Sequence, residues 1–68
     1  MEEPMYIKIH NQIKRDIENH VYQVGDRIPA ERQLAVKFGV SRMTLLQAIK
    51  TLEDEGILEL RLVSGTYV

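Results

Sequence analysis

The chain has 68 residues, no cysteine and a formal net charge of −1, so it is long enough for one small domain without disulfides, thiol catalysis or cysteine-based metal sites. Its composition, 44% hydrophobic and 28% charged, is typical of a globular domain and not of a disordered segment. No apolar run approaches the roughly 18 residues of a membrane span, and no signal peptide is recognisable, so we expect a cytoplasmic protein with no membrane partner.

The first expected element is an amphipathic helix from Pro4 to about His20. Its apolar residues recur at spacings of three and four, which places them on one face of a helix: Tyr6, Ile9, Ile13 and Ile17. The next segment, VYQVGDRIP, contains a Gly25-Asp26 turn signal and a proline that favours extended geometry before it. We therefore expect a loop or a very short strand there.

Two further helices are expected, joined by a tight turn. The first is short and runs from Ala30 to Phe38 with a poor N-cap, because alanine cannot accept a hydrogen bond. Gly39 permits the positive φ that ends this helix, and Ser41 is a good N-cap for the second, which Gly56 stops. The second helix has an inward stripe of Leu45, Ala48, Ile49 and Leu52. By subtraction, its outward residues are Arg42, Met43, Leu46, Gln47 and Lys50.

The C-terminal segment, ILELRLVSGTYV, favours two short strands joined by a turn at Ser64-Gly65. Three helices followed by a β-hairpin make a mainly α fold, the winged helix-turn-helix, as a single domain over residues 1–68. In such folds the first turn of the second motif helix approaches base edges. Arg42 and Thr44 are therefore candidate DNA contacts, since arginine can bind guanine O6 and N7 or a phosphate. The alternative is a merely solvated first turn.

The sequence does not indicate an enzyme, a cofactor or a metal site. His10 and His20 lie ten residues apart without the spacing of a metal motif, so we expect both to be solvated. Ser41 is a cap and not a nucleophile, because GVSRMTL lacks the flanking glycine of a nucleophile elbow. The net charge argues mildly against nucleic-acid binding. However, five basic residues follow Ala30, which allows a basic face: Arg32, Lys37, Arg42, Lys50 and Arg61.

One stretch, IPAERQLAVKFGVSRMTLLQAIKTLEDEGIL, followed by SGTYV, resembles the N-terminal DNA-binding domain of the GntR family of bacterial transcription repressors. The matching runs are 28–32, 38–42, 55–56 and 65–68, in the family's order. The SRMTL and GTYV segments look most like the HutC-type branch, whose effector domains often sense sugars or related metabolites. The resemblance implies a sequence-specific repressor that binds a palindromic operator as a homodimer and needs no cofactor.

The resemblance also implies which residues touch DNA. Arg32 and the start of the third helix would contact it, Gln47 and Lys50 would reach the backbone, and the wing tip would enter the minor groove. Arg32 could instead form an intramolecular salt bridge. The candidate DNA-binding residues are Arg32, Ser41, Arg42, Met43, Thr44, Leu46, Gln47, Lys50, Val63, Ser64, Gly65 and Thr66. A small-molecule effector would bind a C-terminal domain that this chain lacks, and the isolated domain would be monomeric in solution.

Three positions depart from the family pattern on the surface expected to face DNA. The family commonly has arginine at positions 46 and 60 and glycine at position 63, where this chain has Leu46, Leu60 and Val63. Together with Leu62 they could form an apolar patch for a protein partner, weaken DNA binding, or contact thymine methyl groups. The first possibility defines the rival function, a winged-helix protein-interaction module. Val63 is also a poor residue for a turn position that needs positive φ.

Overall fold

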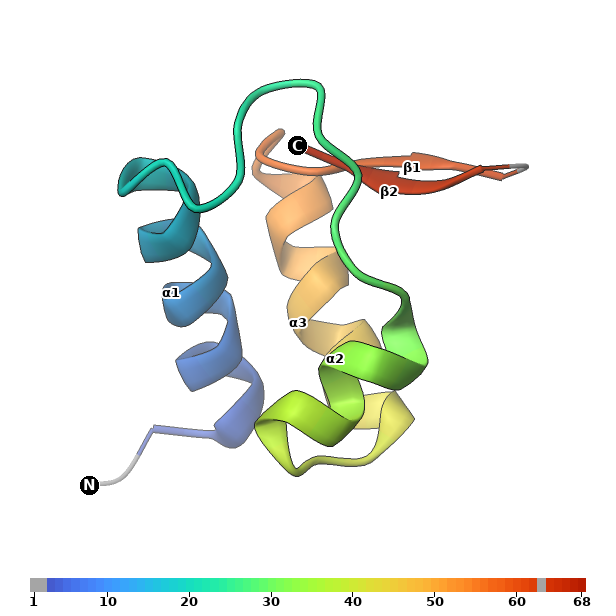
Figure 1. Ribbon diagram of the computed structural model, residues 1–68. Coiled ribbons are helices and arrows are strands. Elements are labelled where there is room, and N and C mark those ends of the chain that lie inside the picture. The colour runs from blue at the N-terminus through green and yellow to red at the C-terminus, as the bar shows by residue number, and fades with distance from the viewer. Residues whose placement is uncertain (1–2, 63) are drawn as a thin grey trace.

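The computed structural model describes residues 3–62 and 64–68, and these form three helices and a two-stranded wing (Figure 1). The helices are α1 (Met5–Glu18), α2 (Glu31–Phe38) and α3 (Arg42–Asp54). The strands are β1 (Glu59–Arg61) and β2 (Gly65–Tyr67). Helix α1 runs beside α3, α2 packs on α3 at its N-terminal half, and the hairpin projects away from the helices (Figure 1). The predicted winged helix-turn-helix fold is confirmed.

The core lies where the apolar faces of the three helices meet. The inward stripe predicted for α3 is confirmed, because all four of its residues are buried and Leu45, Ala48 and Leu52 have no exposed surface. The loop before α2 and the segment before β1 each contribute one further residue. The full set of buried core residues is Ile9, Ile13, Ile28, Leu34, Leu45, Ala48, Ile49, Leu52 and Leu58.

The helix ends follow from local backbone chemistry. Helix α1 stops at Glu18, slightly before the predicted end, and His20 adopts a left-handed φ of 61°. Ala30 provides no side-chain cap to α2, as expected. Gly39 ends α2 with φ 66°, a conformation that glycine tolerates without strain. Ser41 Oγ then accepts a hydrogen bond of 3.2 Å from the Thr44 amide and starts α3 as predicted.

The wing is held by a third segment that lies outside the hairpin. Strands β1 and β2 are antiparallel, with Leu60 opposite Thr66. On the other edge of β2, the Ile28 amide donates to the Thr66 carbonyl at 3.0 Å, and the Val68 amide donates to the Asp26 carbonyl at 2.9 Å. The very short strand considered for this loop therefore pairs with the wing. The Ser64 amide donates to the Arg61 carbonyl at 3.2 Å, and Gly65, which was predicted to lie in the turn, begins β2.

Candidate nucleic-acid interface

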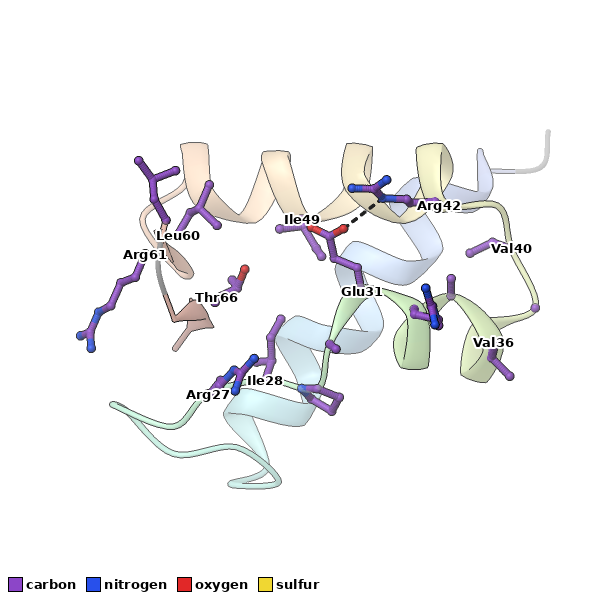
Figure 2. Close-up of a pocket in the computed structure, with 17 residues that line it drawn as sticks. Arg27, Ile28, Glu31, Val36, Val40, Arg42, Ile49, Leu60, Arg61 and Thr66 are labelled. Carbon is purple, nitrogen blue, oxygen red and sulfur yellow. Dashed lines mark hydrogen bonds and ion pairs between the residues drawn. The ribbon is translucent and has the colours of Figure 1, made fainter.

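A groove of about 920 Å³ separates the wing from α2 and the start of α3 (Figure 2). The buried side chains of Ile28 and Ile49 contribute to its lining. Five charged residues line it, four of them arginines: Arg27, Glu31, Arg32, Arg42 and Arg61. The groove is therefore locally basic although the chain as a whole carries a net charge of −1. The negative net charge therefore does not argue against binding of a polyanion such as DNA at this groove.

Arg42 stands at the start of α3 and is held by Glu31 from the start of α2. Its Nε donates to Glu31 Oε2 at 3.2 Å, as the dashed line in Figure 2 shows, and its side chain is 75% exposed. Because the bond uses Nε, the two terminal nitrogens of the guanidinium can still donate to a bound ligand. An ion pair this exposed adds little to the stability of the fold, so its main effect is to orient the Arg42 guanidinium.

Arg32 is exposed on α2 and lines the same groove. Among residues 3–62 and 64–68, Arg32 forms no salt bridge. The groove carboxylate, Glu31, pairs with Arg42 instead. Sequence reasoning missed this pairing because Glu31 and Arg42 belong to different helices, whose relative position depends on the turn at Gly39. The capping signals predicted that turn, and the crossing of the two helices brings the charges together.

The first turn of α3 combines capping and exposed groups. Ser41 Oγ also donates to Thr44 Oγ1 at 3.0 Å, so both hydroxyls take part in the cap, and Thr44 is half-buried. Met43 and Gln47 are exposed on this helix. Lys50 is exposed as well but forms an ion pair of 3.1 Å with Asp54, one turn further along α3. The exposed face thus offers one guanidinium, one amide, one thioether and one paired ammonium.

Gly65 marks the place where the wing meets the loop before α2. Its φ is 120°, and a Cβ at this position would lie 2.8 Å from Arg27 Nε. On β1, the Arg61 guanidinium lies over the Tyr67 ring at 4.1 Å from the centroid. Ser64 is exposed, and Thr66 is half-buried along the groove. Arg27 was not among the predicted site residues, because nothing in its local sequence connects it with the wing.

Comparison with known protein families shows which family this chain belongs to. The model of the bacterial regulatory proteins of the gntR family matches residues 5–68. The chain belongs to the gntR family. The fold is the winged helix of DNA-binding domains in this family of bacterial regulatory proteins. The rival interpretation as a protein-interaction module is not favoured.

Curated relatives of this gntR-family chain are bacterial regulators. The histidine utilization repressor of Klebsiella aerogenes is 42% identical over 65 residues, which cover 96% of this chain and 27% of the relative. The Uxu operon regulator of Haemophilus influenzae is 41% identical over 63 residues, covering 93% and 24%. The chain therefore spans about a quarter of the length of these relatives.

Solved structures share the fold closely. The crystal structure of AraR(DBD) in complex with operator ORR3 matches with a TM-score of 0.95 and 32% identity, covering 100% of this chain and 82% of that one. A GntR family transcriptional regulator from Listeria monocytogenes matches with a TM-score of 0.93 and 30% identity, covering 98% and 59%. None of the helices in the described residues is long and apolar enough to cross a membrane.

The two described departures from the gntR-family pattern, Leu46 and Leu60, differ in exposure and in position. Leu60 and Leu62 are exposed and line the groove, and Leu62 is 93% exposed. Leu46 was predicted to face outward, but it is half-buried and does not line the groove. A leucine on a helix leans over the preceding turn, which removes part of its surface from water. Val63 lies outside the described residues.

His10 links the middle of α1 to the end of α3. Its Nε2 lies 2.7 Å from Glu55 Oε2, its Nδ1 lies 2.9 Å from Asn11 Oδ1, and its side chain is only 14% exposed. The hydrogen bond to Glu55 raises the pKa of His10 above its usual value against the opposing effect of burial. The prediction of a solvated histidine is therefore wrong for His10, whereas His20 is exposed. The partner was missed because Glu55 is far along the chain.

Proposed function

We propose that this domain binds one half-site of a palindromic DNA operator as the DNA-contacting part of a gntR-type repressor. The observation that supports this proposal best is the basic groove with Arg42 at the start of α3, its terminal nitrogens available to a ligand. In helix-turn-helix proteins this part of the second helix faces the base edges of the major groove. AraR(DBD), which shares the fold, was solved in complex with an operator, and this likeness supports operator binding by the present domain.

Within this proposal, each group of candidate residues contacts a different part of the DNA. Arg42 and Thr44 contact bases in the major groove, and Arg32 contacts a base or a backbone phosphate. Ser41, Met43, Gln47 and Lys50 flank them on the same helix or its cap. Residues Ser64 to Thr66 approach the minor groove. No cofactor or covalent step is needed, because recognition depends on hydrogen bonds and charge alone.

The whole regulator is a longer protein in this proposal, since the chain corresponds to about a quarter of its curated relatives. A C-terminal domain would bind a small-molecule effector, of a sugar-related or similar metabolite class, and would join two copies. Two copies match a palindrome because protein and operator then share a two-fold axis. The isolated domain would be monomeric in solution and would act in the bacterial cytoplasm, on the nucleoid when bound.

Site selection from a pool of random duplexes tests the function directly. We expect the domain to enrich one sequence, and Arg42→Ala to lower affinity for that sequence by about tenfold to a hundredfold, the worth of one bidentate base contact. Lys14→Ala, an exposed charge change on α1, is the control and should keep the preference. Failure to enrich any sequence, or an Arg42→Ala variant with unchanged affinity, would contradict the proposal.

A second pair of variants separates the explanations for the leucines. Leu46→Arg with Leu60→Arg restores the two cations that the family pattern has at these positions. If only this variant enriches a site, the leucines have weakened DNA binding. If the present chain enriches its own site with a steep salt dependence, the leucines belong to an altered specificity that includes contact with thymine methyl groups.

A further inference from the structure

One face of the wing carries two arginines, one at each edge of β2. In an antiparallel pair, residues directly opposite each other lie on the same face of the sheet. Arg61 of β1 is opposite Gly65, and Arg27 of the loop before α2 is opposite Tyr67. Both arginines therefore share a face with Gly65 and Tyr67, while Leu60 and Thr66 occupy the other face.

Each arginine leans diagonally across the strand between them. Arg61 is paired with Gly65, but its guanidinium lies over the Tyr67 ring, 4.1 Å from the centroid. Arg27 is paired with Tyr67, but its side chain lies over Gly65, where Nε is 2.8 Å from the place of a Cβ. The two cations thus lie on the same face of β2, one over Gly65 and one over Tyr67, and the φ of 120° at Gly65 favours a glycine beneath Arg27.

The charges around this pair are only partly compensated. Arg61 Nη2 contacts Glu59 Oε2 at 3.4 Å, a long and exposed ion pair of little energetic weight. Among the residues that the structure describes, Arg27 has no ion pair. Stacking on Tyr67 restricts the Arg61 side chain and leaves its N–H groups able to donate. Exposed guanidiniums on one face of the wing are suited to bind phosphate oxygens.

We propose that Arg27 and Arg61 form a clamp that contacts two phosphates of the DNA backbone, one at each edge of β2, beside the bases that α3 contacts. The clamp rests on the proposed function, because both arginines line the groove that also contains Arg32 and Arg42. Arg27 belongs to neither the helix-turn-helix nor the hairpin, so the loop between α1 and α2 becomes part of the DNA-binding surface. Its contact fixes the position of the wing on the duplex and carries no sequence information.

The test compares the salt dependence of DNA binding in charge-matched variants. Arg27→Ala/Arg61→Ala removes two cations from the wing, and Lys14→Ala/Arg15→Ala removes two from α1. Arg27→Lys/Arg61→Lys keeps the charges but not the stacking geometry. Binding is measured at two salt concentrations on the duplex that the unaltered domain selects and on an unrelated duplex, with circular dichroism confirming that each variant is folded.

We expect the alanine pair on the wing to lower the slope of log affinity against log salt by about two, one for each cation that no longer neutralises phosphate charge. The advantage of the unaltered domain over this variant should then shrink about tenfold between about 50 and 200 mM salt. The lysine pair should keep most of the slope, and the α1 pair should match the unaltered domain.

Two results would overturn the clamp: an unchanged slope in the wing alanine pair, or an equal loss in the lysine pair, which would indicate damage to the wing rather than removal of charge. The unrelated duplex separates this outcome from failure of the proposed function. Phosphate contacts act on any sequence, so the slope comparison decides the clamp even if no preferred site is selected.

Discussion

The helical body and the wing of this domain are stabilised in different ways. In the body, apolar side chains from α1, α2 and α3 fill a common core, and α3 alone supplies four buried residues. In the wing, all three residues of β1 are exposed, and the strands depend on backbone hydrogen bonds from both edges of β2. The substitutions that the body tolerates are therefore limited by side-chain volume, whereas those that the wing tolerates are limited by backbone conformation.

The largest expected effect comes from removing volume from the body. Leu52→Ala deletes a side chain with no exposed surface in the middle of the core. Such a change lowers the free energy of unfolding by about 2 to 5 kcal/mol, because apolar burial decreases and a cavity remains. A domain of this size has little stability beyond that, so a large fraction of the variant should be unfolded at 37 °C.

Urea unfolding followed by circular dichroism measures this difference. Val36→Ala is the matched control, since Val36 is a branched residue on α2 whose side chain is 78% exposed. Its free energy of unfolding should stay within about 0.5 kcal/mol of the unaltered domain. If both variants lost stability equally, side-chain packing would not be what distinguishes the body.

A smaller effect, confined to the wing, is expected for Gly65→Ala. The substitution forces a residue with a Cβ into φ 120° and brings that atom to 2.8 Å from Arg27 Nε. Backbone strain of this kind costs about 1 to 3 kcal/mol. Because Gly65 lies outside the buried core, the helices should remain folded while the wing opens more often.

Amide hydrogen exchange separates the two regions in this variant. The Ile28 amide, which donates to Thr66, should exchange faster, while the Ile49 amide in α3 should be affected only through global unfolding. Adding Arg27→Ala removes the collision but not the strained φ, so it should restore protection only in part. Full restoration would show that the arginine, and not the backbone, demands glycine here.

The same contrast explains what the sequence could predict. Helical periodicity and the signals at Gly39 and Ser41 are local, so the three helices, the core stripe of α3 and the tight turn followed from them. The pairing of residues 25–28 with β2, the contact between Glu31 and Arg42, and the approach of Arg27 to Gly65 depend on segments distant in the chain. No local pattern contains them, because each follows from the assembled fold.

Leu46 shows a related limit at a single position. Its place off the core stripe indicated an outward direction, and the position is indeed absent from the buried core. Periodicity assigns each residue an angle around the helix, but it does not give the cover that neighbouring side chains provide. The half-buried state of Leu46 depends on that cover, so the sequence alone could not separate it from the exposed Leu60.

The smallest expected effect is a pH dependence of the body through His10 and Glu55. The hydrogen bond to Glu55 raises the pKa of His10 in the folded state above the ordinary value of 6.5. The folded protein then binds the proton more tightly than the unfolded chain does. This contribution to stability is fully present below the unfolded pKa and is lost as the pH rises through the folded pKa.

Urea midpoints between about pH 5.5 and 8.5, where histidine titrates, measure this contribution. Glu55→Gln is the informative variant, because it removes the charge that stabilises protonated His10 while keeping a hydrogen-bonding side chain. The unaltered domain should exceed this variant in stability most at the acidic end, and the difference should shrink as the pH rises. His20→Gln, which alters an exposed histidine, should follow the unaltered domain throughout. A difference that is constant with pH would mean that the link between α1 and α3 does not depend on the proton.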